Sequence, residues 1–167
     1  GAAFPGAVSV RETTLHALVV DVCRSLSDQG FTRIVVVNNH FEPAHVATLR
    51  AATAEAGVAY LDLVRRRHVE RLTEEFRSGA SHAGRYETSL VLADRPDLVD
   101  TDNMASLPAV PVDMPALMAG GADDFLAMGM DRGYCGAPAE ATAAEGESTF
   151  DTLTDLVAET IREAARG

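Results

Sequence analysis

A short run of apolar, mostly β-branched residues does most to limit how this chain can fold. Residues 32–38, "TRIVVVN", show no polar alternation, which is typical of a strand buried on both faces of a parallel sheet. Before it, residues 12–29 carry apolar side chains at helical spacing, and after it residues 44–56 are rich in alanine. Residues 58–64, "VAYLDLV", form a second candidate strand. The order helix, strand, helix, strand predicts an α/β fold with a mostly parallel sheet.

The rest of the chain is expected to complete one domain over residues 1–167. Gly30 and Gly57 stand where glycines usually end helices. Further along, the pattern predicts helices over 65–80, 84–95 and 139–165, and an irregular segment over 101–137.

The charge of the chain narrows the classes of partner. The formal net charge is −11 and the pI is about 4.7, a balance that repels phosphate backbones and anionic membrane surfaces. We therefore expect neither a nucleic-acid nor a membrane partner, whereas a divalent cation would be attracted. The two cysteines form no CxxC pair, which favours a reducing, cytoplasmic compartment.

The first candidate site follows the apolar run. Asn38, Asn39, His40 and Glu42 stand at the carboxyl end of the predicted strand, where ligands collect in parallel α/β sheets. Imidazole and carboxylate suit Zn²⁺ or Mn²⁺, and one intervening residue lets both side chains point the same way. Two ligands are fewer than the three protein groups of a catalytic zinc. The alternative is a loop histidine beside a glutamate that is favoured by the helix dipole.

Two further stretches carry candidate chemistry. In "GASHAGRYETS", residues 79–89, His82 is a candidate general acid or base, because the ordinary pKa of histidine, about 6.5, lies near working pH. The alternative there is a helix start capped by Ser81. In "GYCGAPAEATAAEGE", residues 133–147, glycines suggest a tight loop that approaches a ligand or a neighbouring subunit. We do not expect Cys135 to be a nucleophile.

Four segments in order resemble the creatininase family. They are "FPGAVSV", "GFTRIVVVNNHFEP", "SHAGRYETSLVLADRPDLVD" and "GYCGAPAEATAAEGE". The resemblance implies a three-layer α/β/α fold and a dinuclear Zn²⁺ or Mn²⁺ site. It also implies that a metal-activated water hydrolyses the C–N bond of a small cyclic amide, a formamide or a peptide-like substrate. The enzyme class implied is that of amidohydrolases, which act on C–N bonds other than peptide bonds.

The resemblance also implies roles for individual residues. His40 and Glu42 match metal ligands of the family, and Glu42 also takes part in catalysis. His82 matches the histidine that passes a proton to the leaving nitrogen, and Glu87 matches a supporting glutamate. Phe41, Ser81 and Asn39 are placed at the substrate.

The sequence departs from the family pattern at several positions. Asn39 replaces a glycine, Ser81 replaces an acidic residue, and the chain has no tryptophan, so creatinine itself is not the expected substrate. The family segment that supplies the remaining metal ligands is missing before Gly1, so we expect a domain truncated at its N-terminus.

This truncation leaves alternatives open. The missing segment is cut off, is a separate polypeptide, or belongs to the protein beyond this sequence. We expect a homo-oligomer, with a hexamer as one form, or a second chain that supplies the segment. The alternative function is a non-catalytic or incomplete creatininase-like subunit that acts as an interaction partner.

Overall fold

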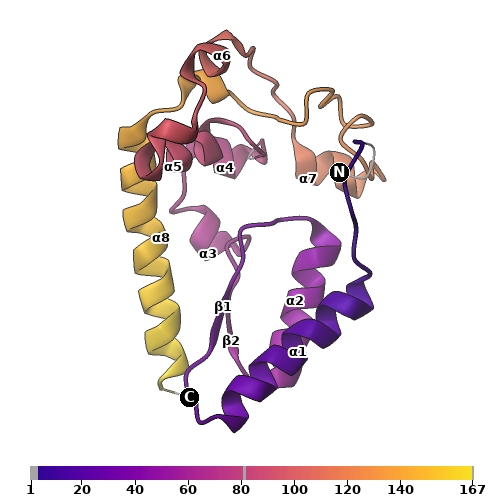
Figure 1. Ribbon diagram of the computed structural model, residues 1–167, viewed down its shortest axis with the longest axis vertical. Helices are drawn as coiled ribbons and strands as arrows, with labels where there is room; N and C mark the ends of the chain where they lie inside the picture. The colour runs from indigo at the N-terminus through magenta and orange to yellow at the C-terminus, as the bar shows by residue number, and fades with distance from the viewer. Residues whose placement is uncertain (1–3, 81, 167) are drawn as a thin grey trace. The chain divides into compact units, whose positions relative to one another are not determined.

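The computed structural model describes residues 4–80 and 82–166, and Figure 1 shows their helices and strands in chain order. The chain divides into two compact units. The strand unit comprises Ser9–Val69 with Leu153–Gly167, and the helical unit comprises Gly1–Val8 with Glu70–Thr152. The last helix, α8 (Ala143–Ala164), contributes residues to both units.

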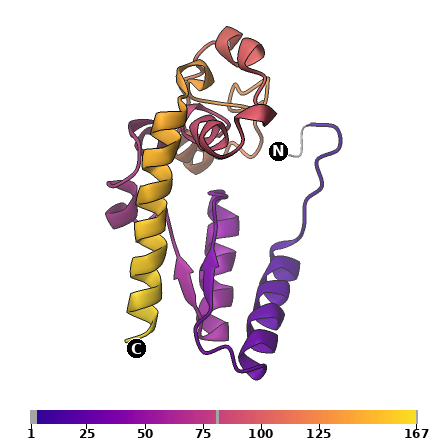
Figure 2. The ribbon, with the colours of Figure 1, turned by 60° about the vertical axis from the view of Figure 1, so that its left-hand side comes forward.

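The strand unit is built on a parallel pair of strands. Its elements are α1 (Glu12–Asp28), β1 (Val35–Val37), α2 (Pro43–Ala56), β2 (Ala59–Leu61), α3 (Arg66–Val69) and the C-terminal part of α8. Strand β1 pairs in parallel with β2, with Val36 opposite Tyr60. Helices α1 and α2 pack together on one side of the strands, and the C-terminal part of α8 lies on the other side (Figure 1 and Figure 2). This arrangement agrees with the predicted α/β class.

Both predicted glycine stops are found in the strand unit. Gly57 ends α2 in the left-handed conformation, with φ of 69°, and Gly30 follows α1 with φ of 91°. The strands are shorter than predicted, and the expectation of a strand buried on both faces is wrong for β1, because Val35 and Val36 are only half-buried and Val37 is 56% exposed.

Only some of the apolar residues of the helix predicted over 12–29 are buried in α1. Val20 and Cys23 are buried, whereas Leu18 is 60% exposed and Val22 is 49% exposed. The helix packs chiefly on α2, so only a narrow stripe of its apolar residues is covered. Elsewhere in the strand unit, Arg67 of α3 forms a bidentate ion pair with Glu163 of α8, with an Nη2–Oε2 distance of 3.1 Å.

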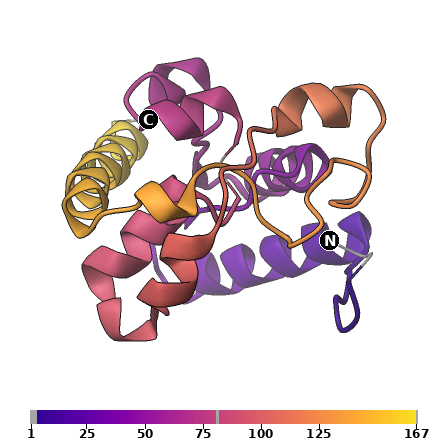
Figure 3. The ribbon, with the colours of Figure 1, turned by 90° about the horizontal axis from the view of Figure 1, so that it is seen from above.

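The helical unit is made of short helices and loops. Its elements are α4 (Glu74–Ser78), α5 (Arg85–Asp94), the 3₁₀ turn η1 (Pro96–Leu98), α6 (Thr101–Ser106), α7 (Met114–Ala119), the 3₁₀ turn η2 (Pro138–Glu140) and the first part of α8. Turn η2 contacts both α5 and α6, as Figure 3 shows from above. A small core of Ala80, Met128, Met130 and Cys135 lies among the loops.

Two sequence predictions fail in and next to this unit. The single helix expected over 65–80 is divided into α3 and α4, because Thr73 begins a new helix by accepting a hydrogen bond from Phe76 N–H. The segment expected to be irregular contains α6 and α7. Asp100 and Asp113 start these helices, since each side chain accepts a hydrogen bond from a backbone N–H of the first turn.

Helices α5 and α8 meet closely inside the helical unit. Ser89 of α5 is fully buried, and its hydroxyl oxygen accepts a hydrogen bond from Thr142 N–H at 3.1 Å. A Cβ atom on Gly146 of α8 would overlap the carbonyl oxygen of Ser89. The glycine is therefore required by the close approach of the two helices.

Within residues 4–80 and 82–166, no helix combines the length and the apolar character that a membrane span requires.

Candidate functional site

The turn after β1 is organised by the side chain of Asn38. Its Nδ2 donates a hydrogen bond to the carbonyl oxygen of His40 at 2.6 Å, and its Oδ1 accepts one from His40 N–H at 3.3 Å. Asparagine side chains commonly close turns in this way, by bonding to the backbone two residues on. The turn fixes the backbone of His40 directly beyond the carboxyl end of the strand.

His40 and Glu42 lie side by side in this turn. The distance between His40 Nε2 and Glu42 Oε2 is 3.5 Å, and the two side chains are 57% and 59% exposed. Glu42 is the N-cap residue of α2, and Pro43 occupies the first helical position. The helix start therefore positions Glu42, while Asn38 positions His40.

His45 and Tyr60 also contact the side chain of Asn38, and neither was predicted to belong to this candidate site. His45 Nε2 lies 3.0 Å from Asn38 Oδ1, and its ring meets the His40 ring edge-on with a centroid distance of 4.8 Å. Burial lowers the pKa of His45, and the nearby His40 lowers it further. The hydroxyl of Tyr60, from β2, lies 3.5 Å from Asn38 Nδ2. Burial raises the pKa of Tyr60, and the Asp62 carboxylate raises it further.

The donor pair of the turn fits two coordination positions of one divalent ion. Two ligands of a tetrahedral zinc, each about 2.1 Å from the ion, lie roughly 3.4 Å apart. The observed 3.5 Å between His40 and Glu42 matches this separation. No group of three or more histidine, cysteine, aspartate or glutamate side chains converges on such a position in the part of the chain that the structure describes. The described residues therefore offer two donors at this position, fewer than the three protein groups of a catalytic zinc.

The second candidate residue, His82, lies in the helical unit. Its side chain is half-buried, and its ring packs against Phe125 with a centroid distance of 4.6 Å. Its carbonyl oxygen accepts a hydrogen bond from Cys135 N–H at 2.8 Å. Ser81, predicted at the substrate, lies outside the described residues. The contact with Phe125 carries no sequence signal, because residues 101–137 show no periodic pattern.

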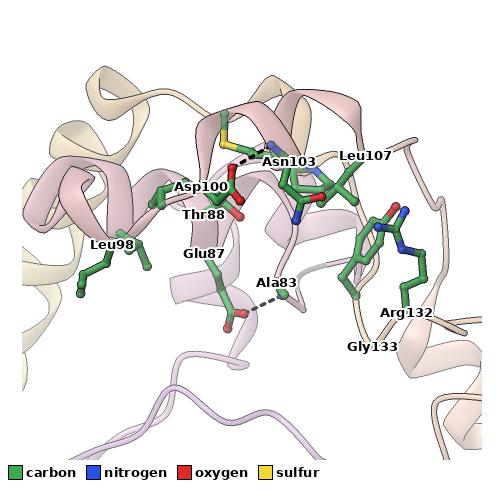
Figure 4. Close-up of a pocket in the computed structure, with 14 residues that line it drawn as sticks. Ala83, Glu87, Thr88, Leu98, Asp100, Asn103, Leu107, Arg132 and Gly133 are labelled. Atoms are coloured by element: carbon green, nitrogen blue, oxygen red, sulfur yellow. Dashed lines mark hydrogen bonds between the residues drawn. The ribbon is translucent and has the colours of Figure 1, made fainter.

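The backbone after His82 is held in an unusual conformation. Ala83 has φ of 50°, in the left-handed region that residues other than glycine rarely adopt. Glu87, in the first turn of α5, accepts a hydrogen bond from Ala83 N–H at 2.7 Å (Figure 4). A glutamate at this helix position often reaches back to the preceding backbone in this way. Glu87 thus supports the loop that carries His82.

A shallow cavity of about 450 Å³ opens on the helical unit beside Ala83 and Glu87. Figure 4 shows side chains of mixed character around it, among them Thr88, Asn103 and Arg132.

Cys135 has no features of a nucleophile. It is fully buried, and its thiol donates a hydrogen bond to the sulfur of Met114 at 3.5 Å. Burial raises the pKa of the Cys135 thiol, which keeps it in the unreactive protonated form at neutral pH.

The predicted site residues fall into two groups. His40, Glu42, the exposed Asn39 and the half-buried Phe41 lie in the strand unit, in the turn after β1 and at the start of α2. His82 and Glu87 lie in the helical unit. The side chains of His40 and Glu42 lie next to each other in the structure. Glu87 accepts a hydrogen bond from the backbone N–H of Ala83, the residue after His82.

Comparison with known sequences identifies a family for this chain. The profile of the creatininase family, described as creatinine amidohydrolase, matches residues 1–161. A mycofactocin precursor peptide peptidase from Mycolicibacterium smegmatis is 34% identical over 166 residues, covering 95% of this chain and 60% of that protein. A creatinine amidohydrolase from Pseudomonas putida is 36% identical over 121 residues, covering 63% of this chain and 46% of that protein. The chain spans at most 60% of the length of these two relatives.

Solved structures give the same result for the fold. A manganese form of creatininase is similar with a TM-score of 0.67 at 27% identity, covering 98% of this chain and 68% of that chain. A mutant creatininase of the Zn–Zn type has a TM-score of 0.65 at 27% identity, with the same coverage. A putative creatinine amidohydrolase from Bacteroides fragilis has a TM-score of 0.69 at 22% identity, covering 98% and 66% of the two chains. These likenesses confirm the predicted α/β fold.

Proposed function

Since the chain belongs to the creatininase family, we propose that it forms part of a metal-dependent hydrolase that cleaves the C–N bond of a small amide or peptide-like substrate. The observation that carries the proposal is the His40–Glu42 pair, whose donor atoms lie 3.5 Å apart beyond the carboxyl end of β1. Relatives named as a creatinine amidohydrolase and a peptide peptidase, and creatininases named as Mn and Zn–Zn forms, support this chemistry.

We assign to His40 and Glu42 the task of holding a divalent ion, Zn²⁺ or Mn²⁺. Both donors are more than half exposed, so an ion reaches them without any rearrangement of the turn. Such an ion lowers the pKa of water and polarises a carbonyl group. The remaining ligands come from outside the described residues, either from a further segment of the same protein or from a partner chain.

The other predicted residues act on the substrate or support the site. His82 passes a proton to the leaving nitrogen, and Glu87 steadies the loop that carries it through its bond to Ala83 N–H. Asn39 and Phe41, which flank His40, contact the substrate, as does Ser81. The substrate is a cyclic amide, a formamide or a peptide-like molecule, and the assembly is a homo-oligomer.

Metal content and hydrolysis test this proposal together. We expect the purified full-length protein to contain a stoichiometric divalent metal by elemental analysis. We expect His40→Ala and Glu42→Gln to lose most of it, whereas the surface variant Glu74→Gln retains it. A panel of cyclic amides, N-formyl compounds and short peptides then defines the substrate class. Protein that contains no metal and is inactive on the whole panel would overturn the proposal in favour of a non-catalytic subunit.

A further inference from the structure

One carboxylate of the helical unit makes contacts that the proposed chemistry does not explain. The half-buried Glu75, in α4, accepts a hydrogen bond from Tyr86 N–H through Oε2 at 2.6 Å. Its other oxygen, Oε1, accepts one from Ala137 N–H at 2.7 Å. These donors lie 11 and 62 residues away along the chain. Glu75 therefore joins three separate segments.

The backbone leaves a space of the right shape for this carboxylate. A Cβ atom on Gly84 would lie 2.8 Å from Glu75 Oε2, and one on Gly136 would overlap Glu75 Oε1. Gly136 also has φ of 88°, which disfavours other residues. Both glycines thus stand where the loops close around the side chain of Glu75.

The two loops that Glu75 joins are the ones that hold His82. Cys135 N–H donates to the His82 carbonyl oxygen at 2.8 Å, directly before the Gly136–Ala137 segment. Tyr86 follows His82 by four residues and lies in the first turn of α5. The loop after Cys135 is itself fixed, because Gly136 and Val110 exchange two backbone hydrogen bonds of 2.8 Å. The backbone of His82 is therefore tied on both sides to segments that Glu75 connects.

We propose that Glu75 is a positioning residue for His82, holding the His82 loop and the loop at residues 133–137 in one mutual arrangement. The inference rests on the proposed function, in which His82 transfers a proton. It also explains why this position needs a carboxylate. Two backbone N–H groups require two acceptor oxygens, and a negative charge at the N-terminus of α5 is favoured by the helix dipole. A glutamine offers one acceptor only, and its NH₂ group faces the second N–H.

The test uses Glu75→Gln with Glu74→Gln as the matched control, because Glu74 is the exposed neighbour on the same helix. In the full-length protein, we expect Glu75→Gln to speed amide hydrogen exchange of Tyr86 or Ala137 by about tenfold or more. We expect the ring carbon and proton resonances of His82 to shift or broaden. With a substrate found as above, kcat falls by about tenfold while KM changes by less than about twofold. Glu74→Gln leaves all of these quantities unchanged.

Two further points keep the test decisive. If Glu75→Gln does not fold, Glu75→Asp is measured instead, since it keeps the charge but is too short to reach both N–H groups, and the same shifts are expected. Unchanged exchange and unchanged His82 resonances in a folded variant overturn the inference, even when the wild-type protein is active. Failure of the proposed function looks different, because wild-type protein without metal or activity would leave the exchange and resonance readouts intact.

Discussion

The side chain of Asn38 donates a hydrogen bond to the carbonyl oxygen of His40, with an Nδ2–O distance of 2.6 Å. Through Oδ1 it also meets His45, so one amide orients the backbone of a candidate metal ligand and the ring beside it. Groups that orient metal ligands typically change metal affinity by about 10–100-fold when they are removed. We therefore expect Asn38 to affect binding at the proposed metal site without touching the ion.

We expect Asn38→Ala to weaken binding of Mn²⁺ or Zn²⁺ to the full-length protein by about 10–100-fold, as measured by calorimetric titration. Asn103→Ala, which removes a similar amide from α6 in the helical unit, serves as the control and retains wild-type affinity. Equal affinities for wild type and Asn38→Ala would show that the turn holds His40 without this side chain.

The buried carboxylate of Asp62 provides a test of stability. Asp62 is 1% exposed, and its Oδ2 lies 2.7 Å from Arg50 Nε and 3.3 Å from Arg65 Nε. Its Oδ1 has no hydrogen-bond partner among the residues that the structure describes. The contacts with the two arginines are therefore the main interactions that offset the free-energy cost of burying the Asp62 carboxylate.

We expect Arg50→Gln to lower the free energy of unfolding by about 1–3 kcal/mol, because a buried carboxylate loses its shortest bond. Arg65→Gln should cost less, since its contact is longer. Arg24→Gln breaks an exposed pair with Glu55 and should change the free energy by less than about 1 kcal/mol. Urea unfolding of the three variants measures the order, and a smaller effect at Arg50 than at Arg24 would contradict it.

Because α5 and α8 approach each other closely, we expect a glycine-to-alanine substitution at their contact to have the opposite of its usual effect on stability. Replacing glycine by alanine inside a helix usually stabilises it by about 1 kcal/mol. At Gly146 the added methyl group would overlap the Ser89 carbonyl, so we expect Gly146→Ala to destabilise the protein by about 1–3 kcal/mol in thermal or urea unfolding. The exposed neighbour Glu147→Ala should stay within about 0.5 kcal/mol of wild type. A more stable Gly146→Ala protein would refute the packing described for these helices.

Tyr86 predicts a loss of stability at alkaline pH. Its side chain is fully buried, and burial raises the pKa of its hydroxyl, with a further contribution from the Glu87 carboxylate. In the unfolded chain the hydroxyl ionises near its ordinary pKa of about 10. Above that pH the unfolded state binds fewer protons than the folded state, so the free energy of unfolding decreases as pH rises.

We expect the contribution of Tyr86 to be fully present below about pH 10 and to fall by up to about 1.4 kcal/mol for each further pH unit. Urea unfolding between pH 8 and pH 11 measures the slope. Tyr86→Phe cannot ionise, so its slope should be smaller than that of wild type, whatever its stability at neutral pH. Identical slopes would mean that Tyr86 ionises in the folded protein as it does in the unfolded chain.

Local patterns predicted the long elements well. The helix expected over 84–95 is α5, Arg85–Asp94, and the helix expected over 12–29 is α1, Glu12–Asp28. In both, apolar spacing continues over several turns, and the order of strands and helices follows from it. The pairing of His40 with Glu42 was also predictable, because its two members are separated by only one residue.

Contacts between distant residues could not be predicted in this way. Tyr60 reaches Asn38 only because β2 pairs with β1 in one register, and Glu75 binds donors that lie up to 62 residues away. Short helices were missed for another reason. Their starts depend on single capping residues such as Asp100 and Asp113, in a segment rich in proline where periodicity has no length to develop.

Because of the left-handed backbone of Ala83, we expect one substitution at this position to act differently on thermal stability and on catalytic turnover. With φ of 50°, Ala83 carries a conformational cost of about 1 kcal/mol or more, which glycine would not carry. Ala83→Gly should therefore tolerate heat as well as the natural chain or better, while the peptide next to His82 samples more conformations. We expect selection for heat resistance to favour glycine at position 83, and selection for turnover to retain alanine there.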